Sequence, residues 1–445
     1  MPISTPPGYA RLDEAGVRQW LAAEAALAAR LGGTPAEWQI DEVGDGNLNI
    51  VYVIRGPAGG VCVKQSLPYV RVAGESWPMP LERAYFEQLY LRTSEPAVSG
   101  LTPRLLHYDP VRFAFAMELL GEHLILRRGL IAGHRYPTAA RRVGEYVARS
   151  AFATSVLAEP FERVNDRLAA FACNQALTRI TVDLIFTHPY RENERNRWTS
   201  PQLDDVVASL RADARLKAAV GQLGYRFMTL HEALLHGDLH TGSVMVNAAD
   251  TRIIDAEFAI YGPIGFDLGL FIGNLLMAYF SQPGHGSLAP APSQQAQGSL
   301  GPADESFGHD GGRRKHGEWI LAQIVAFWHE FVARFSALWS AKRAGDGYPS
   351  SFITTPEDAA AFALERQQWL ARLHADTLGY AGAEIIRRIV GFAHNADFET
   401  IQNPDLRGSC ERRSLAFARE LIVTPGNFPT IEAVIEAAAG LSGTP

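Results

Sequence analysis

Acidic side chains in the middle of the sequence are spaced as a phosphoryl-transfer site requires. Asp238 lies in the segment His-Gly-Asp-Leu-His, directly after an apolar pair, and Asp255 and Glu257 follow a later apolar run, Ile-Ile. In phosphoryl transfer one carboxylate orients the attacking hydroxyl and accepts its proton, and others hold Mg²⁺ across the phosphates of ATP. The pattern favours this chemistry over the alternative of single aspartates that cap turns.

A glycine-rich segment and a lysine precede this acidic set. Residues 44–49 read Gly-Asp-Gly-Asn-Leu-Asn between two apolar runs. Glycine N–H groups can approach a phosphate closely, although the same residues also form plain hairpin turns. Lys64 ends the next apolar run, where an ammonium can pair with nucleotide phosphates. Such a lysine needs a carboxylate on the following helix, for which we predict Glu87, with Glu82 as the alternative.

Two histidines flank Asp238. His236 and His240 have a spacing that can bind zinc on a helix, but this segment is predicted to be a turn and no third ligand lies nearby in the sequence. We predict that His236 makes structural hydrogen bonds and that His240 lies near the substrate.

Short β-branched runs and longer helical patterns must position these residues. The first third of the chain predicts strands and the remainder helices, which is typical of an α+β fold with two lobes. We predict an N-terminal antiparallel-sheet lobe at 1–119 and a larger, mostly helical C-terminal lobe at 120–445, with short strands only at 234–261. The N-terminal elements are expected as a helix at 15–31, strands at 38–43, 48–55 and 61–64, a helix at 80–92 and a strand at 113–119.

Residues 282–315 differ in composition from the rest of the chain. They are rich in Pro, Gly, Ser and Gln and hold few large apolar side chains. Such a segment buries too little apolar surface to offset the entropy lost on ordering. We therefore predict a flexible insert between two helices.

The overall composition excludes several classes of protein. The chain has 445 residues, a net charge of −7 and three cysteines. This length suits two domains or one bilobal domain, the charge argues against nucleic-acid binding, and the few cysteines argue against a disulfide framework. The sequence shows neither a signal peptide nor a long apolar span, so we expect a cytoplasmic protein without a membrane partner.

Separated motifs together resemble a known family. The matching segments are 44–49, Val-Lys-Gln at 63–65, Pro-Tyr-Val-Arg-Val-Ala-Gly-Glu-Ser-Trp-Pro at 68–78, 236–243, 255–267 and Ile-Arg-Arg at 386–388. In this order they resemble the 5-methylthioribose kinases, which belong with the aminoglycoside and choline phosphotransferases and have a fold similar to that of protein kinases. The resemblance runs from about residue 35 to the C-terminus. It implies ATP-dependent phosphorylation of the anomeric hydroxyl of S-methyl-5-thioribose, in methionine salvage, by a homodimer.

The resemblance also implies roles for particular residues. Asp238 is expected as the catalytic base and a sugar contact, with Mg²⁺ held by Asp255 and Glu257. The other nucleotide contacts that it implies are Asn49 of the loop over the phosphates, Lys64, the backbone of the hinge residues Met117, Glu118 and Leu119, and Ala256.

On the sugar side, the resemblance points to an arginine pair and a tryptophan. Arg387 or Arg388 is expected to face the sugar or the transferring phosphate, because a guanidinium neutralises charge that develops there. The sequence does not indicate which of the two faces inward, and spacing alone would also suit a pair on a helix surface. Gly74 to Pro78 is expected as a loop that closes near the site, with Trp77 either a substrate contact or a lid over apolar surface.

Some positions depart from the wider pattern. Ser243 stands where the superfamily has Asn, and Asp255-Ala256-Glu257 replaces Asp-x-Asp or Asp-Phe-Gly. Both departures look like the methylthioribose kinase pattern. By contrast, Ala256 stands where that family is expected to have Pro, and the 282–315 insert is longer than expected.

Two alternatives remain at this level. One is another small-molecule kinase of the same fold, acting on an aminoglycoside, choline or homoserine; a cationic acceptor would call for acidic or aromatic groups around it. The other is a nucleotide-binding pseudokinase, which would be favoured if Asp238 or Asp255 were missing, and both are present.

Overall fold

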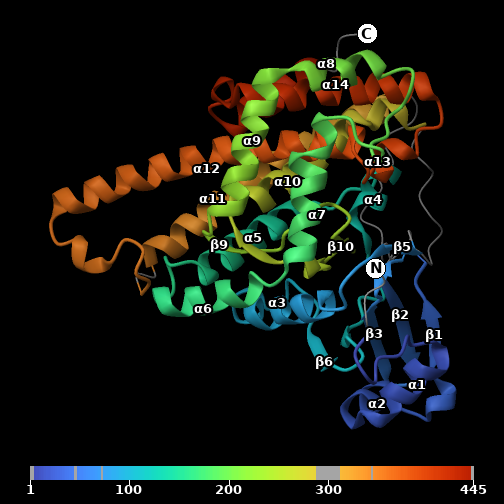
Figure 1. The fold of residues 1–445 in the computed structure, drawn as a ribbon. Coiled ribbons are helices and arrows are strands. Elements are labelled where there is room, and N and C mark those ends of the chain that lie inside the picture. Colours follow the sequence, from blue (N-terminus) through green and yellow to red (C-terminus); the bar gives the residue numbers. More distant parts are fainter. Residues whose placement is uncertain (1–4, 45–47, 72–73, 287–310, 342–343, 442–445) are drawn as a thin grey trace.

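A five-stranded antiparallel sheet forms the N-terminal part of the molecule. The computed structural model describes residues 5–44, 48–71, 74–286, 311–341 and 344–441. The strand order is β1-β2-β3-β7-β6, and the helices that follow lie above the sheet and to its left (Figure 1). The strands are β1 (Gln39–Glu42), β2 (Asn49–Gly56), β3 (Gly59–Ser66), β6 (Leu105–Asp109) and β7 (Ala114–Glu118). The predicted α+β fold with an N-terminal antiparallel sheet and a mostly helical remainder is confirmed.

Two short helices cover one face of this sheet. The alternating residues Ile50, Tyr52 and Ile54 of β2 are buried against them. We expected one helix at 15–31, which is wrong, because Glu24 has an extended backbone (φ −95°, ψ 98°) and separates α1 (Glu14–Ala23) from α2 (Ala25–Leu31). The break lets apolar residues of both helices contact the same core.

Helix α3 (Arg83–Val98) lies between the sheet and the C-terminal helices (Figure 1). Its residues Ala84 and Leu91 pack with Phe115 of the sheet. Phe86 and Tyr90 instead belong to the large apolar core of the C-terminal part. One helix therefore contacts both parts of the molecule.

The C-terminal part is built around α10 (Gly265–Phe280), in which every residue is buried. A helix that is apolar on all sides must be enclosed by its neighbours. Here α11 (Gly311–Ala341) and α12 (Pro356–Val390) pack against it. The other helices are α4 (Leu126–Ala132), α5 (Ala139–Thr154), α6 (Phe161–Phe171), α7 (Gln175–Phe186), α8 (Asp204–Ala212), α9 (Ala214–Thr229), α13 (Ala396–Glu399), α14 (Pro404–Val423) and α15 (Ile431–Gly440).

Short strand pairs bring the two acidic segments side by side. Strand β9 (Ala233–Leu235) pairs with β12 (Ile260–Gly262), and β10 (Val244–Val246) pairs with β11 (Thr251–Ile253) and with β8 (Leu124–Ile125). Residues 236–243 connect β9 to β10, and residues 254–259 connect β11 to β12. Because both ends of these connections are paired, the two connections must run next to each other.

The predicted insert at 282–315 is ordered at its two ends. Gln282–Gly284 form a 3₁₀ turn, and residues 311–315 are the beginning of α11. The part at 287–310 lies outside the described residues, so its flexibility stays a prediction.

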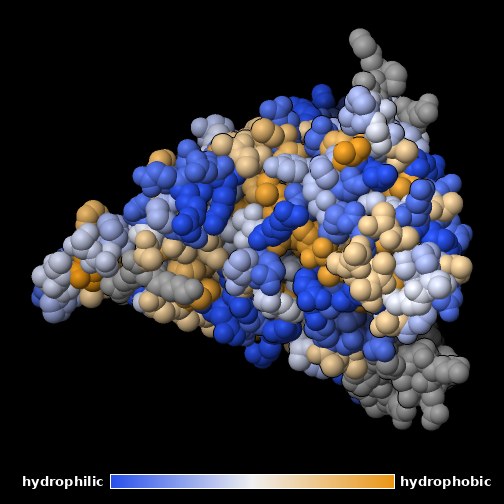
Figure 2. All heavy atoms as spheres, turned by 90° about the horizontal axis from the view of Figure 1, so that it is seen from below, coloured by the Kyte–Doolittle hydropathy of each residue, from blue (hydrophilic) through white to orange (hydrophobic). Residues whose placement is uncertain are grey.

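In the described ranges, no helix is long and apolar enough to cross a bilayer. Hydrophilic and hydrophobic residues alternate over the face in Figure 2.

Candidate active site

Lys64 is the centre of the first group of charged residues. Its Nζ lies 2.6 Å from Oε2 of Glu87 on α3 and also bonds Oδ1 of Asp255, which follows β11. Lys64 and Glu87 are buried, whereas the Asp255 side chain is 46% exposed. Glu87 is thus the partner of Lys64, as predicted, and the alternative Glu82 is not. We call Lys64, Glu87, Asp255, Glu257, Asn49 and Arg83 the lysine cluster.

Glu257 occupies the inner end of the lysine cluster. Asn49 Nδ2 donates to its Oε2 at 2.9 Å, and Arg83 Nε lies 3.5 Å from the same oxygen. Arg83 Nη2 also donates to Asn49 Oδ1 at 3.0 Å, so the three side chains bind one another. All three are buried. Asn49 begins β2, and the structure therefore links the end of the glycine-rich segment to the second acidic segment.

The backbone at 255–259 aims these two carboxylates. Asp255 has φ +73°, a left-handed conformation that is uncommon for a residue with a side chain. The 3₁₀ turn Ala256–Phe258 follows it, with Ala256 buried. Asn174 Nδ2 donates to the carbonyl oxygens of Glu257 and Ala259 at 2.9 and 3.1 Å and fixes the turn.

The interaction between Lys64 and Asp255 favours the charged form of both side chains. Burial lowers the pKa of Lys64, but the attraction of Asp255 and Glu87 outweighs burial and raises it. Burial raises the pKa of Asp255, and Lys64 outweighs that effect and lowers it. For Glu257, burial dominates and raises the pKa.

Asp238 is the centre of the second group. Arg387 Nη2 donates to its Oδ1 at 3.0 Å, and Arg388 Nη2 lies 3.6 Å from the same oxygen. Both arginines are in α12 and are nearly buried. Burial raises the pKa of Asp238, but His240, Arg387 and Arg388 outweigh burial and hold it well below its usual range. Both arginines therefore lie at the site, and the helix-surface alternative is wrong.

Glu384 lies behind the two arginines. Its Oε1 accepts from Arg388 Nε at 2.8 Å, and its Oε2 accepts from Arg387 Nε. It is fully buried. Burial raises the pKa of Glu384, yet Arg387 and Arg388 outweigh burial and lower it to about 2. We call Asp238, His240, Glu384, Arg387 and Arg388 the arginine cluster.

A tight backbone turn holds Asp238 in place. Gly237 has φ +82°, and a side chain there would meet the Phe258 carbonyl oxygen at 2.2 Å. Asp267 at the start of α10 accepts from the N–H groups of His236 and Gly237 at 2.7 and 3.0 Å. His236 Nε2 donates to the Ile254 carbonyl oxygen at 2.8 Å and so ties the two acidic segments together. This is the hydrogen-bonding arrangement predicted for His236.

His240 faces the Asp238 carboxylate. Its Nδ1 accepts from the Gly242 N–H at 2.9 Å, which leaves the ring proton on Nε2, 3.4 Å from Asp238 Oδ2. Ser243 Oγ donates to the Asp238 carbonyl oxygen at 2.9 Å. The serine that replaces the superfamily asparagine therefore supports the turn.

The two clusters lie next to each other. The pairing of β10 with β11 and the His236–Ile254 hydrogen bond hold the two connections side by side. Carboxylates on the two adjacent connections thus face a lysine from the sheet on one side and two arginines on the other.

The Trp77 segment differs from the expected loop. Gly74–Pro78 form strand β5, paired with β4 (Tyr69–Val70). The centroids of the Trp77 and Phe392 rings are 5.3 Å apart, and Arg195 Cζ lies 4.1 Å from the centroid of the Trp77 ring. Phe392 follows α12 by two residues, so Trp77 joins the N-terminal hairpin to the chain beyond the arginine cluster.

The expected hinge residues lie at the end of strand β7. Met117 and Glu118 are the last residues of β7, and Leu119 follows. The N–H of Glu118 donates to the Arg104 carbonyl oxygen at 2.9 Å. Because this N–H is already hydrogen-bonded, fewer backbone groups of the expected hinge are left to contact an adenine ring. Of the glycine-rich segment, residues 45–47 lie outside the described residues.

The donor set suits a magnesium ion in one respect. Mg²⁺ prefers carboxylate oxygens and commonly takes one or two from the protein, with the rest from phosphates and water. Asp255 and Glu257 supply two such carboxylates on one turn. No group of three or more metal-ligating side chains occurs among the described residues. A metal here would thus rely on the nucleotide for its other ligands.

Several residues at the site were not predicted from the sequence. They are Arg83 and Asn174 of the lysine cluster and its turn, Asp267 below Gly237, and Glu384 with its neighbours Asn274 and Arg127. Glu384 carried a usable signal, because an acid three and four residues before two arginines on a helix lies on their side of it. Asp267 ends the matching segment 255–267, although no role was assigned to it, and the others belong to no motif that the sequence analysis identified.

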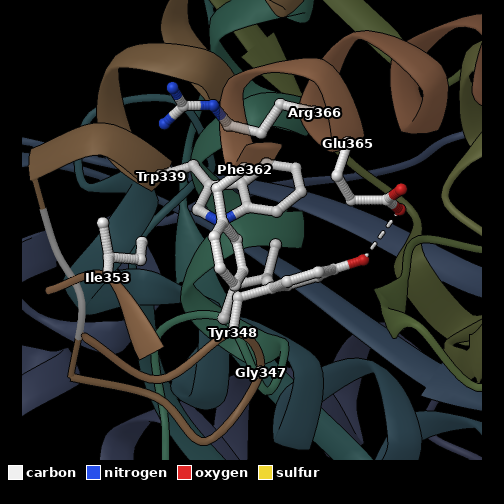
Figure 3. A pocket seen from close by; sticks show the side chains of 8 residues that line it. Trp339, Gly347, Tyr348, Ile353, Phe362, Glu365 and Arg366 are labelled. Atoms are coloured by element: carbon white, nitrogen blue, oxygen red, sulfur yellow. Dashed lines mark hydrogen bonds between the residues drawn. The ribbon is translucent and has the colours of Figure 1, made fainter. Parts of the chain in front are cut away.

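A small cavity lies elsewhere, between the end of α11 and the beginning of α12. Figure 3 shows the aromatic rings of Trp339, Tyr348 and Phe362 around it, and Tyr348 bonded to Glu365 at 3.0 Å. Its volume of about 20 Å³ holds roughly one water molecule. It is too small for a nucleotide or a sugar.

Comparison with known proteins gives consistent matches. The model of the phosphotransferase enzyme family matches residues 40–305. A methylthioribose kinase from Escherichia coli O45:K1 is 41% identical over 439 residues, covering 98% of this chain and 99% of that protein. Methylthioribose kinase 2 from Oryza sativa subsp. japonica is 39% identical over 431 residues, covering 96% and 95%. A solved choline/ethanolamine kinase family protein from Mesorhizobium loti aligns at 15% identity and a TM-score of 0.41, over 94% of this chain and 98% of that one, a level that adds nothing to the assignment.

Proposed function

The chain belongs to the methylthioribose kinase family, within the phosphotransferase enzymes, and on that premise we propose that it phosphorylates S-methyl-5-thioribose. The phosphoryl group comes from ATP and is transferred to the anomeric hydroxyl. The products are ADP and methylthioribose 1-phosphate, a step of methionine salvage.

The observation that carries this proposal is the meeting of the two clusters. Asp238 faces Arg387 at 3.0 Å on one side and His240 on the other, while Lys64 and Asp255 lie opposite. Loose phosphoryl transfer needs a carboxylate for the attacking hydroxyl and cations around the transferring group, and little else from the protein. The family supplies the identity of the sugar, because the geometry alone specifies only a hydroxyl.

In the proposed reaction Asp238 orients the sugar hydroxyl. Because its pKa is held well below the usual range, its carboxylate is charged and accepts the hydroxyl hydrogen bond at neutral pH. His240 and Arg387 fix its two oxygens. Arg387 and Arg388 are then placed to neutralise charge on the transferring phosphoryl group.

Lys64 and the acidic turn would hold the nucleotide. Lys64 exchanges Asp255 for the α- and β-phosphates and keeps Glu87 as its orienting partner. Asp255 and Glu257 would hold a Mg²⁺, which would neutralise phosphate charge. In this proposal residues 44–49 cover the phosphates, with Asn49 a polar contact, and Ala256 and the backbone at 117–119 contact the nucleotide.

Other parts of the proposal rest on the family alone. Trp77 is assigned to the sugar side of the site, next to Phe392. A homodimer, a cytoplasmic location and a lobe boundary near residue 119 stay predictions.

The direct test is turnover. We expect Mg-ATP and methylthioribose to give equimolar ADP and a sugar 1-phosphate, identified by phosphorus NMR, and Asp238→Asn to abolish the reaction. When choline, homoserine or an aminoglycoside replaces methylthioribose, we expect no release of ADP above background. Turnover of one of those acceptors instead would replace methylthioribose as the substrate, and ATP binding without any turnover would favour the pseudokinase.

A further inference from the structure

Glu384 joins the two arginines that face Asp238. It precedes them by three and four residues on α12, so all three side chains leave the same side of the helix. Arg387 and Arg388 each use Nε to grip a different oxygen of its carboxylate. Their terminal nitrogens are thereby directed onward to Asp238, at 3.0 and 3.6 Å.

A buried chain of hydrogen bonds anchors Glu384 from behind. Asn274 on α10 donates Nδ2 to Glu384 Oε1 at 2.9 Å, and its Oδ1 accepts from Arg127 Nη2 at 2.8 Å. Arg127 on α4 donates from Nε to Thr241 Oγ1 at 3.2 Å. Thr241 belongs to the same connection as Asp238. The chain therefore starts and ends at residues 236–243, and it fixes α12 relative to that connection.

Stability alone does not account for this arrangement. A buried carboxylate with two guanidiniums gives little or no stability over packed apolar residues of similar size. The same arrangement does restrict guanidinium geometry, since both arginines are held at Nε and Arg387 is also bonded at Nη2. Cations that are held in place before the reaction stabilise the charge on a transferring phosphoryl group without reorganising.

We propose that Glu384 is a positioning residue for phosphoryl transfer, which acts by fixing the guanidiniums of Arg387 and Arg388 against Asp238. This inference rests on the proposed kinase activity of the same site. It assigns to Glu384 no contact with either substrate. Asn274 and Arg127 support it as the second layer of the same network.

The substitution Glu384→Gln tests the proposal with almost no change of shape. A glutamine has one acceptor oxygen, and the Oε1 position already serves two donors, Arg388 and Asn274. The glutamine nitrogen would therefore face Arg387 Nε, donor against donor, and release Arg387. We expect kcat to fall about 10²-fold, as for a catalytic group displaced by about 1 Å, with KM for ATP unchanged.

A double-mutant cycle separates positioning from a general structural role. In an Arg387→Met background the guanidinium that Glu384→Gln would release is absent, and Arg388 keeps its oxygen acceptor, so we expect the further effect of Glu384→Gln on kcat to be below about 3-fold. Equal losses in both backgrounds would show that Glu384 acts independently of Arg387 and would overturn the proposal, as would an unchanged kcat in the single variant.

Glu411→Gln is the matched control. Glu411 on α14 is also buried and accepts from Arg407 Nε at 2.8 Å, four residues before it, so the change removes a similar ion pair. We expect its kcat to stay near that of the wild type. If Glu384→Gln does not fold, Glu384→Asp keeps both oxygens one methylene short and should lose about 10-fold; failure of both variants to fold would make the role structural and refute the proposal.

The two proposals fail in different ways. If the wild type does not turn over methylthioribose, the proposed function fails, and the same cycle is measured on the slow hydrolysis of Mg-ATP by water. Dependence of that hydrolysis on Glu384 only when Arg387 is present would still support positioning. Turnover of methylthioribose with an additive cycle would keep the function and remove the role of Glu384.

Discussion

The lysine cluster and the arginine cluster are built in opposite ways. The lysine cluster takes its members from β2, β3, α3 and the turn after β11, so it depends on how the sheet and the helical part meet. The arginine cluster comes only from α12 and residues 236–243, which the buried network from Arg127 to Glu384 joins together. Asp255 is 46% exposed, whereas Glu384 is completely buried.

This difference separates a part that ligands can rearrange from a part that is built in advance. The Lys64–Asp255 pair occupies groups that the nucleotide and its metal would need, so binding has to break it. The arginine cluster needs no such exchange. A preorganised electrostatic site does not spend reorganisation energy during the reaction, and four tests follow from this contrast.

Loss of Lys64 should have the largest effect. Lys64→Met removes the ammonium that binds Asp255 and Glu87 and leaves two carboxylates without their cation. We expect kcat/KM for ATP to fall about 10³-fold, from steady-state kinetics with methylthioribose in excess. Lys217→Met, at an exposed position on α9, is the control and should behave as the wild type. A loss below about 10-fold would deny Lys64 its place on the phosphates.

The second-largest effect should be on stability, where the protonation of Asp397 makes the free energy of unfolding depend on pH. Burial raises the pKa of Asp397 to about 6, from an ordinary value of 3.8, beside Arg127 at 3.1 Å. Between these values the folded protein binds more protons than the unfolded chain, so the free energy of unfolding falls as pH rises from about 4 to about 6. Asp397→Asn has no proton to lose and should gain about 3 kcal/mol relative to the wild type over this range.

Urea denaturation of Asp397→Asn and the wild type at pH 4 and pH 7 measures this gain. Asp166→Asn, on the exposed side of α6, is the control and should show no such difference. A constant gap between wild type and Asp397→Asn at both pH values would mean that Asp397 is charged throughout.

The two arginines should be unequal. Arg387 Nη2 lies 3.0 Å from Asp238 and Arg388 Nη2 lies 3.6 Å from it, so Arg387 has the better bond. We expect Arg387→Met to lower kcat about 10²-fold and Arg388→Met about 10-fold, with KM for ATP the same in both. The reverse order would place Arg388, and not Arg387, against the reacting groups.

Trp77 should give the smallest change. It joins the β4–β5 hairpin to Phe392 and lies under Arg195, contacts worth about 1 kcal/mol at a partly exposed site. Trp77→Leu should raise KM for the sugar about 5-fold with kcat nearly constant. Trp198→Leu removes a similar contact with Arg211, at 4.9 Å, and is the control. An equal effect of both variants would assign Trp77 to stability only.

The sequence indicated the lysine cluster better than the arginine cluster. Lys64 and Glu87 were predictable because a strand lysine needs a carboxylate on the next helix, and two apolar runs placed the acidic turns. Strand β5 was missed as a strand because β4 has only two residues and offers no alternation to read. The break at Glu24 was missed because both halves of 15–31 have helical composition.

The arginine cluster was harder because its members are joined only in space. Glu384 is anchored by Asn274 and Arg127, which lie on two other helices and show no relation to Glu384 in the sequence. Such residues are explained only by their partners, since a buried polar group must be hydrogen-bonded. The order of Arg387 and Arg388 likewise follows from distances to Asp238 and not from their adjacent positions.

Helix α3 carries Arg83 and Glu87 one turn apart, and each holds a different member of the lysine cluster. Because both residues belong to one helix, a displacement of α3 would detach Lys64 and the Asn49–Glu257 pair together. A compound that wedged α3 away from the sheet would silence the enzyme without competing against either of its substrates.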